Sequence, residues 1–170
     1  FSYGTGQGYF VPLDVTNTKE VLSQFKSFFE NENIEKIGQN LKWFSKVLKV
    51  YGIDLNGPIF NTTLAHYLLQ PDMRHDLNVL SETYLNYEIQ RLEEIIGKKG
   101  KNQLKFEALD LTKRADYVVE VADINFQLKQ KFEKYLEEKG LSKLFSTIEM
   151  PLSRVLASME LEGIRLDASY

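Results

Sequence analysis

The sequence contains no cysteine and only two histidines in 170 residues. Without cysteine, the chain cannot form a disulfide framework, an iron–sulfur cluster or a cysteine-ligated zinc site. Two histidines also argue against a metal site built from several imidazoles. Any metal chemistry would therefore have to depend on carboxylates, which the chain supplies as 24 Asp and Glu residues.

Long apolar runs and a strong charge imbalance are missing as well. No apolar run approaches the roughly 20 residues of a membrane span, and no signal peptide is visible, so we expect a soluble protein without a membrane partner. The net charge of −3 argues against a protein that coats nucleic acid by bulk electrostatics, although a local basic groove remains possible. With 43% hydrophobic residues, the chain has the size and composition of one ordinary domain.

Both ends of the chain favour a piece of a longer protein. The sequence opens with Phe1-Ser2-Tyr3, without an initiator methionine and already within an aromatic, strand-like stretch. It closes at Tyr170, directly after an amphipathic segment. We therefore expect part of the chemistry to lie outside this chain.

Glycines, capping residues and apolar spacing predict the secondary structure. The glycines of residues 4–8 favour a β-hairpin over a phosphate-binding loop, because a strand-like segment follows them where such a loop would open a helix. Short strands are expected at 34–38 and 58–60. Helices are expected from Asn17, at 40–50, at 64–69, after Asp76, from Asp110 to about Lys139, and from about Leu144 to Glu162. Asn61 and Asp110 are expected to cap the starts of two of these helices, and Gly52 and Gly140 to follow the ends of two. The predicted class is α/β, with a short mixed sheet surrounded by helices.

Six segments, taken in order, resemble the bacterial family A DNA polymerases of the DNA polymerase I type. They are residues 36–42 (KIGQNLK), 57–69, 74–82, 97–104 (GKKGKNQL), 117–123 (YVVEVAD) and 148–167. The resemblance implies a ribonuclease-H-like 3′–5′ exonuclease domain over residues 1–146, truncated before its first strand, and the beginning of the polymerase domain over 147–170. It further implies a bacterial cytoplasmic protein of DNA replication and repair. Its partners would be primer-template DNA and the polymerase domain of the same chain.

The resemblance also implies two-metal hydrolysis, in which carboxylates hold Mg²⁺ or Mn²⁺. The family takes an Asp-x-Glu from the first strand, which would precede Phe1, and one Asp from each of two later motifs. Tyr117 matches the tyrosine of the third motif, but Phe44 and Val121 occupy the two Asp positions. Asn61 replaces a further family Asp. We therefore expect no metal site and no exonuclease activity in this chain, with Phe44 and Val121 filling the emptied site if they meet.

Several residues are candidates for nucleic-acid contact. The resemblance places Asn40 and Arg74 near the DNA, although Asn40 is equally a helix N-cap and Arg74 equally a surface residue. Trp43 can stack on a base, but the sequence favours a half-buried core position for it. The basic loop contributes Lys98, Lys99 and Lys101, which either contact phosphates or form a charged surface turn.

Two further features complete the list of candidates. His66 and His75, nine residues apart, are expected to be hydrogen-bonding structural residues rather than a metal pair. Tyr117, without its Asp partner, is expected to be a packed helix residue.

Two alternative functions stay open at this level. One is a working exonuclease that uses the first-strand carboxylates together with ligands such as Glu120 or Asp123. The other is a ribonuclease-D-like RNA-processing enzyme of the same fold. Residues 148–167 argue against the second alternative, because they resemble the opening of a polymerase domain.

Overall fold

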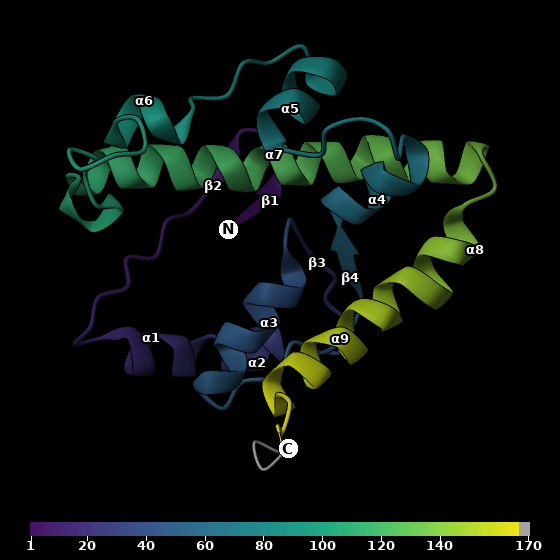
Figure 1. The fold of residues 1–170 in the computed structure, drawn as a ribbon, viewed down its shortest axis with the longest axis horizontal. Coiled ribbons are helices and arrows are strands. Elements are labelled where there is room, and N and C mark those ends of the chain that lie inside the picture. Colours follow the sequence, from purple (N-terminus) through teal and green to yellow (C-terminus); the bar gives the residue numbers. More distant parts are fainter. Residues whose placement is uncertain (167–170) are drawn as a thin grey trace.

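The computed structural model describes residues 1–166, and its longest element is helix α7 (Leu111–Glu138), which crosses the whole molecule (Figure 1). The helix begins where the Asp110 side chain accepts a hydrogen bond from the Lys113 amide at 3.0 Å. It ends before Gly140, which has the positive φ of 67° that glycine tolerates. Both predicted ends of this helix are confirmed. Helices α4 (Thr62–Leu69) and α5 (Leu77–Leu85) contact α7, as do strands β1 (Ser2–Gly4), β2 (Gln7–Gly8) and β3 (Lys36–Gly38), so α7 organises the fold.

The strands of residues 1–166 form two separate pairs. Strands β1 (Ser2–Gly4) and β2 (Gln7–Gly8) are antiparallel, and β3 (Lys36–Gly38) and β4 (Ile59–Asn61) are parallel. Both pairs contact α7, but no described strand joins them into a single mixed sheet. The predicted hairpin at residues 4–8 and the two predicted strands are confirmed, with β3 beginning two residues later than expected.

The hairpin is held closely against α7. Gly8 lies so near this helix that an added Cβ would be 2.4 Å from Val119 Cγ1. The Gly6 amide donates a hydrogen bond of 2.9 Å to the Asp123 carboxylate. Glycine is therefore required at position 8 by close packing and at position 6 by its positive φ of 73°.

The remaining helices pack around these elements. In chain order they are α1 (Thr18–Gln24), α2 (Lys26–Phe29), α3 (Leu41–Val50), α4 (Thr62–Leu69), α5 (Leu77–Leu85), α6 (Leu92–Ile96), the 3₁₀ turn η1 (Phe106–Ala108), α8 (Ser142–Leu144), the π-helical turn η2 (Phe145–Glu149) and α9 (Met150–Glu162). The short elements α6 and η1 were not expected from the sequence. The predicted final helix is confirmed in extent, since α8, η2 and α9 form one continuous helical run.

Two hydrophobic clusters stabilise the fold. The larger one joins β4, α4, α5 and α7 around Phe132, Leu128 and Leu80, which are fully buried. The smaller one joins α1, α2 and α3 around Leu22, Phe29, Leu48 and Ile53. Apolar burial of this kind is the main favourable term in folding.

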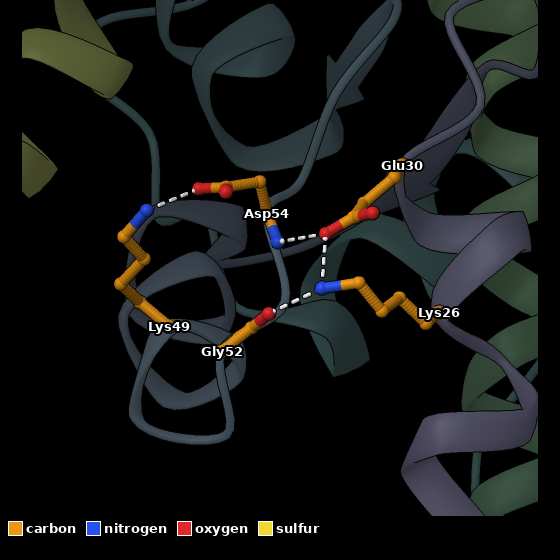
Figure 2. A network of polar contacts seen from close by, with 5 residues as sticks. All are labelled: Lys26, Glu30, Lys49, Gly52 and Asp54. Atoms are coloured by element: carbon orange, nitrogen blue, oxygen red, sulfur yellow. Dashed lines mark hydrogen bonds and ion pairs between the residues drawn. The ribbon is translucent and has the colours of Figure 1, made fainter.

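A polar network fixes the loop between α3 and β4 against α2, as Figure 2 shows. Lys26 donates to the Gly52 carbonyl at 2.5 Å and forms an ion pair with Glu30 at 2.9 Å. Glu30 accepts a hydrogen bond from the Asp54 amide at 3.1 Å, and Lys49 pairs with the Asp54 carboxylate at 2.6 Å. The network therefore sets the position of α3, which carries several candidate site residues.

The C-terminal helix α9 packs on α3, although the two helices are about a hundred residues apart in the sequence. Asp167, which belongs to the last segment of the resemblance, lies outside the described residues, as does the rest of the chain to Tyr170. Within residues 1–166, no helix has both the length and the apolar character needed to cross a membrane.

Candidate nucleic-acid interface

Phe44 occupies the first of the two later Asp positions of the family and packs against the smaller hydrophobic cluster. Helix α3 directs its half-buried ring toward Phe29, at a centroid distance of 5.7 Å in an edge-on arrangement. Such aromatic pairs add to the stability that burial provides. The position is therefore occupied by packing that a carboxylate could not reproduce.

Val121, at the second carboxylate position, packs against the larger cluster instead. Phe44 and Val121 therefore do not meet in one shared apolar site, because α3 and α7 direct the two side chains into different clusters. Next to Val121, the Asn125 amide donates to the Val121 carbonyl at 2.8 Å. Asn125 in turn accepts from the Thr62 hydroxyl at 2.7 Å, which links α7 to the start of α4.

Both nearby carboxylates on α7 have protein partners. Glu120 accepts hydrogen bonds from the Tyr87 hydroxyl at 2.6 Å and the Gln90 amide at 3.3 Å. Asp123 accepts from the Gly6 amide and, at 2.7 Å, from the Gln127 side chain. In the part of the chain that the structure describes, no three His, Cys, Asp or Glu side chains come together as a metal-binding group. The residues present therefore do not fit the carboxylate-held metal pair that the family resemblance implies.

Tyr117 packs against the Phe106 ring at a centroid distance of 6.0 Å, which confirms the expectation of a packed helix residue. Burial raises the pKa of its hydroxyl, and the carboxylates of Glu93 and Glu120 raise it further. The phenol is therefore neutral at physiological pH.

Asn61 has become a structural residue at the start of α4. Its side-chain oxygen accepts hydrogen bonds from the amides of Thr63 at 3.0 Å and Leu64 at 3.2 Å. These amides would otherwise lack partners in the first turn of the helix. The predicted N-cap is confirmed.

Asn40 lies at the N-cap position of α3, but its side chain forms no capping hydrogen bond. Its backbone is left-handed, with a φ of 50°, a conformation that Asn adopts more readily than most residues. Asn40 instead lines a hollow of about 450 Å³ together with Gln39, Lys42, Thr63 and residues of α9. The side chain is thus exposed to an open space at the carboxyl ends of β3 and β4.

Trp43 is 56% exposed, which corrects the expectation of a half-buried core position. The buried residues of α3 are Leu41 and Leu48, and Trp43 projects about 200° around the helix from Leu41. The indole is therefore available for stacking, on the same helix as Asn40.

The other predicted contacts lie elsewhere on the surface. Arg74 is exposed in the turn between α4 and α5, and the exposed Lys98, Lys99 and Lys101 lie in the loop after α6. This loop is beside the first turns of α7, at the opposite end of that helix from α8 (Figure 1). The structure consequently does not gather the loop lysines with Asn40 and Trp43 into one site.

His66 and His75 are hydrogen-bonding structural residues, as expected. Their Nδ1 atoms lie 2.7 Å apart, and His66 Nε2 is 3.0 Å from the Tyr84 hydroxyl. His66 is fully buried against Phe132. Burial, with His75 as the second cause, lowers the pKa of His66.

A charged contact between α3 and α9 was not predicted from the sequence. Lys42 and Lys46 both pair with Glu160, at 2.6 Å and 2.5 Å. The two lysines are four residues apart in the sequence, and this spacing alone predicts that they lie on one face of the helix. Their acidic partner, more than a hundred residues away, gave no such signal.

Comparison with known proteins identifies the family. A family profile described as 3′–5′ exonuclease matches residues 1–137. The chain belongs to the 3′–5′ exonuclease domain family of the family A DNA polymerases. DNA polymerase I of Borreliella burgdorferi is 34% identical over 99% of this chain and 19% of the relative. DNA polymerase I of Pseudomonas aeruginosa is 32% identical over 99% of this chain and 20% of the relative. The chain thus spans about a fifth of the length of these relatives.

Solved structures confirm the predicted ribonuclease-H-like fold class. The structure of the POL domain of Pol1 from M. smegmatis, in complex with DNA primer-template and dNTP, has a TM-score of 0.71 at 24% identity. That match covers 91% of this chain and 24% of the other. Brucella melitensis NrnC has a TM-score of 0.66 at 19% identity, covering 84% and 64% of the two chains. NrnC has also been solved with bound Mg²⁺.

Proposed function

We propose that this domain is a non-catalytic member of its family. In this proposal it contacts DNA weakly and supports the polymerase domain of the same longer protein, in DNA replication and repair in the bacterial cytoplasm. The observation that supports the proposal most directly is the presence of Phe44 and Val121 at the two carboxylate positions, each packed into a different hydrophobic cluster.

Electrostatics explains why these two substitutions matter. Two doubly charged ions about 4 Å apart repel each other by about 16 kcal/mol at an effective dielectric constant of about 20. Carboxylates offset this repulsion because each brings a full negative charge and hard oxygen ligands. Phenylalanine and valine bring neither, so each substitution removes one of the ligands on which the family's metal pair depends.

The remaining carboxylates of α7 are poor replacements. Asp123 accepts hydrogen bonds from the hairpin, and Glu120 accepts them from the segment around Tyr87. Binding a metal would require each carboxylate to give up these hydrogen bonds to the hairpin or to the Tyr87 segment. The alternative of a working exonuclease therefore has no specific observation in its favour.

The surface of α9 agrees with the proposal that this domain supports the polymerase domain. Leu152, Val155 and Met159 are 44%, 54% and 61% exposed, and their spacing of three and four residues places them on one face. An apolar face of this kind suits packing against a following domain. The proposed division after residue 146 lies within the π-helical turn Phe145–Glu149, just before α9.

The proposal is tested in the full-length protein that carries this domain. We expect no calorimetric heat of Mn²⁺ binding from this domain. We also expect no shortening of a labelled, 3′-mismatched primer in Mg²⁺ without nucleotides. The double variant Phe44→Asp, Val121→Asp should gain Mn²⁺ affinity if the strand before Phe1 supplies the family's Asp-x-Glu. Val50→Asp, at a 78% exposed position, controls for added charge.

Primer shortening by the unmodified protein would contradict the proposal. If Glu120→Gln and Asp123→Asn then abolished that shortening, the working-exonuclease alternative would replace the proposal of a non-catalytic domain. Running the same assay on an RNA strand separates the ribonuclease-D-like alternative, which requires degradation of RNA.

A further inference from the structure

The ammonium groups of Lys42 and Lys46 hold one carboxylate between them. Lys42 Nζ lies 2.6 Å from Glu160 Oε1, and Lys46 Nζ lies 2.5 Å from Glu160 Oε2. The lysines are one helical turn apart on α3, so both side chains reach the same point. Each carboxylate oxygen therefore has its own cationic donor.

A phosphodiester presents the same pattern of charge. Its two non-bridging oxygens share one negative charge, as the two oxygens of a carboxylate do, and lysine ammonium groups bind such oxygens in many phosphate sites. We propose that Lys42 and Lys46 form a binding site for a nucleic-acid backbone phosphate, and that Glu160 occupies this site when no nucleic acid is bound. The inference rests on the proposed function, because it requires the domain to contact DNA.

The location of the lysine pair agrees with this role. Lys42 lines the 450 Å³ hollow beside Asn40, and the exposed Trp43 is the next residue along the helix. On the other side, Lys46 and Glu160 line a second, more open hollow of about 910 Å³. The ion pairs thus lie between two hollows, from either of which a nucleic-acid strand could approach the lysines.

The contact is exposed enough to be exchanged. The side chains of Lys42, Lys46 and Glu160 are 36%, 27% and 39% exposed. Ion pairs at this level of exposure are screened by solvent and contribute little to stability. A backbone phosphate, which carries the same single negative charge, can therefore compete with the carboxylate.

Helix α9 has contacts with the rest of the fold besides those of Glu160. Arg154 donates a hydrogen bond to the Gly57 carbonyl, and Met150, Ser153 and Ala157 are buried. A purely structural brace would therefore be redundant here. Loss of the Glu160 carboxylate should leave the helix packed on α3 and the two lysines free.

The test measures the binding of a fluorescein-labelled oligo-dT by anisotropy at low salt. We expect Glu160→Gln to bind about tenfold more tightly than the unmodified protein. We also expect its salt dependence to be steeper by about 0.7 to 1.4 in log Kd per log salt, because one or two further phosphate contacts form. Glu162→Gln, which changes the net charge equally on the same helix, should alter the affinity by less than about twofold.

Adding Lys42→Gln and Lys46→Gln to Glu160→Gln should remove the gain. Thermal melting of every variant verifies that α9 remains folded. Equal affinities of Glu160→Gln and Glu162→Gln would overturn the inference. Inorganic phosphate that displaces the oligonucleotide at equal phosphate concentration would identify a free-anion site and overturn the nucleic-acid assignment.

A parallel variant with Lys98→Gln, Lys99→Gln and Lys101→Gln separates this inference from the proposed function. If that variant loses DNA binding while Glu160→Gln gains none, the proposed DNA contact stands and the lysine-pair site is wrong. If no variant binds DNA, the proposed DNA contact and the lysine-pair site are both wrong.

Discussion

The Nδ1 atoms of His66 and His75 lie 2.7 Å apart, a distance at which one imidazole must donate and the other accept. His66 also contacts the Tyr84 hydroxyl through Nε2, so both of its ring nitrogens are engaged inside the protein. This arrangement joins α4, the turn before α5, and α5 itself. It lies beside Phe132 of α7, in the centre of the larger hydrophobic cluster.

This pair makes the stability of the domain sensitive to mild acid. Burial and the neighbouring His75 lower the pKa of His66, so the folded state resists protonation while the unfolded chain accepts a proton near the ordinary pKa of about 6.5. The stabilising contribution of neutral His66 is therefore complete above about pH 6.5 and is lost as the pH falls below it. Thermal melting between about pH 8 and 5 should show this decline.

Two variants check the assignment. His66→Gln should flatten the dependence of the melting temperature on pH, whereas His75→Gln leaves the buried imidazole in place and should retain part of it. A His66→Gln protein with the same pH slope as the unmodified protein would show that other groups cause the decline. Slopes are compared because either substitution can also lower the melting temperature uniformly.

Gly8 should not tolerate a side chain. In Gly8→Ala, the new methyl group would lie 2.4 Å from Val119 Cγ1, so the hairpin or the helix must move. We expect a loss of about 1–3 kcal/mol in the free energy of unfolding, measured by urea denaturation. Val119→Ala should reduce this loss in the double variant. Gly100→Ala, where the nearest atom is 4.0 Å away, is the control and should be near neutral.

Asn61→Ala should destabilise α4 by about 1 kcal/mol, because the amides of Thr63 and Leu64 lose their acceptor. Asn61→Asp keeps a side-chain oxygen in that place and adds a negative charge at the helix N-terminus, so it should retain most of the stability. Urea denaturation of both variants is the measurement. An unchanged free energy of unfolding in Asn61→Ala would mean that the cap contributes nothing.

Phe132→Ala should be the most destabilising of these substitutions. The ring is fully buried and packs edge-on against Tyr84 at a centroid distance of 4.9 Å. We expect a loss of about 3–5 kcal/mol, through lost burial and the cavity that remains. Leu111→Ala, on the same helix but 52% exposed, should change the free energy of unfolding by less than about 0.5 kcal/mol. A small effect of Phe132→Ala would require that neighbouring side chains collapse into the cavity.

Local features of the sequence predicted the ends of most elements. Asn61 and Asp110 were identified as caps, and Gly52 and Gly140 as helix ends, because each acts through bonds or dihedral angles within a few residues. The resemblance likewise located Phe44 and Val121. That these two residues pack in different clusters could not be predicted, since it depends on how α3 and α7 are placed relative to each other.

Contacts between segments that are distant in the sequence could not be predicted from it. The Glu160 contact with Lys42 joins residues 118 apart, and no local pattern specifies such a pairing. The exposure of Trp43 is a different case. Its angle from Leu41 around the helix indicates the outer face, although aromatic residues tend to be buried.

The bond between the Gly6 amide and Asp123 spans 117 residues and has a consequence for biosynthesis. Ribosomes add about 5–20 residues per second, so roughly 6 to 23 s separate the synthesis of the two partners. During that interval the Ser2–Gly8 hairpin lacks α7, the helix on which it packs in the folded domain. Secure docking of the hairpin must therefore wait until the middle of α7 has left the ribosome, which makes it a late event in the folding of the nascent chain.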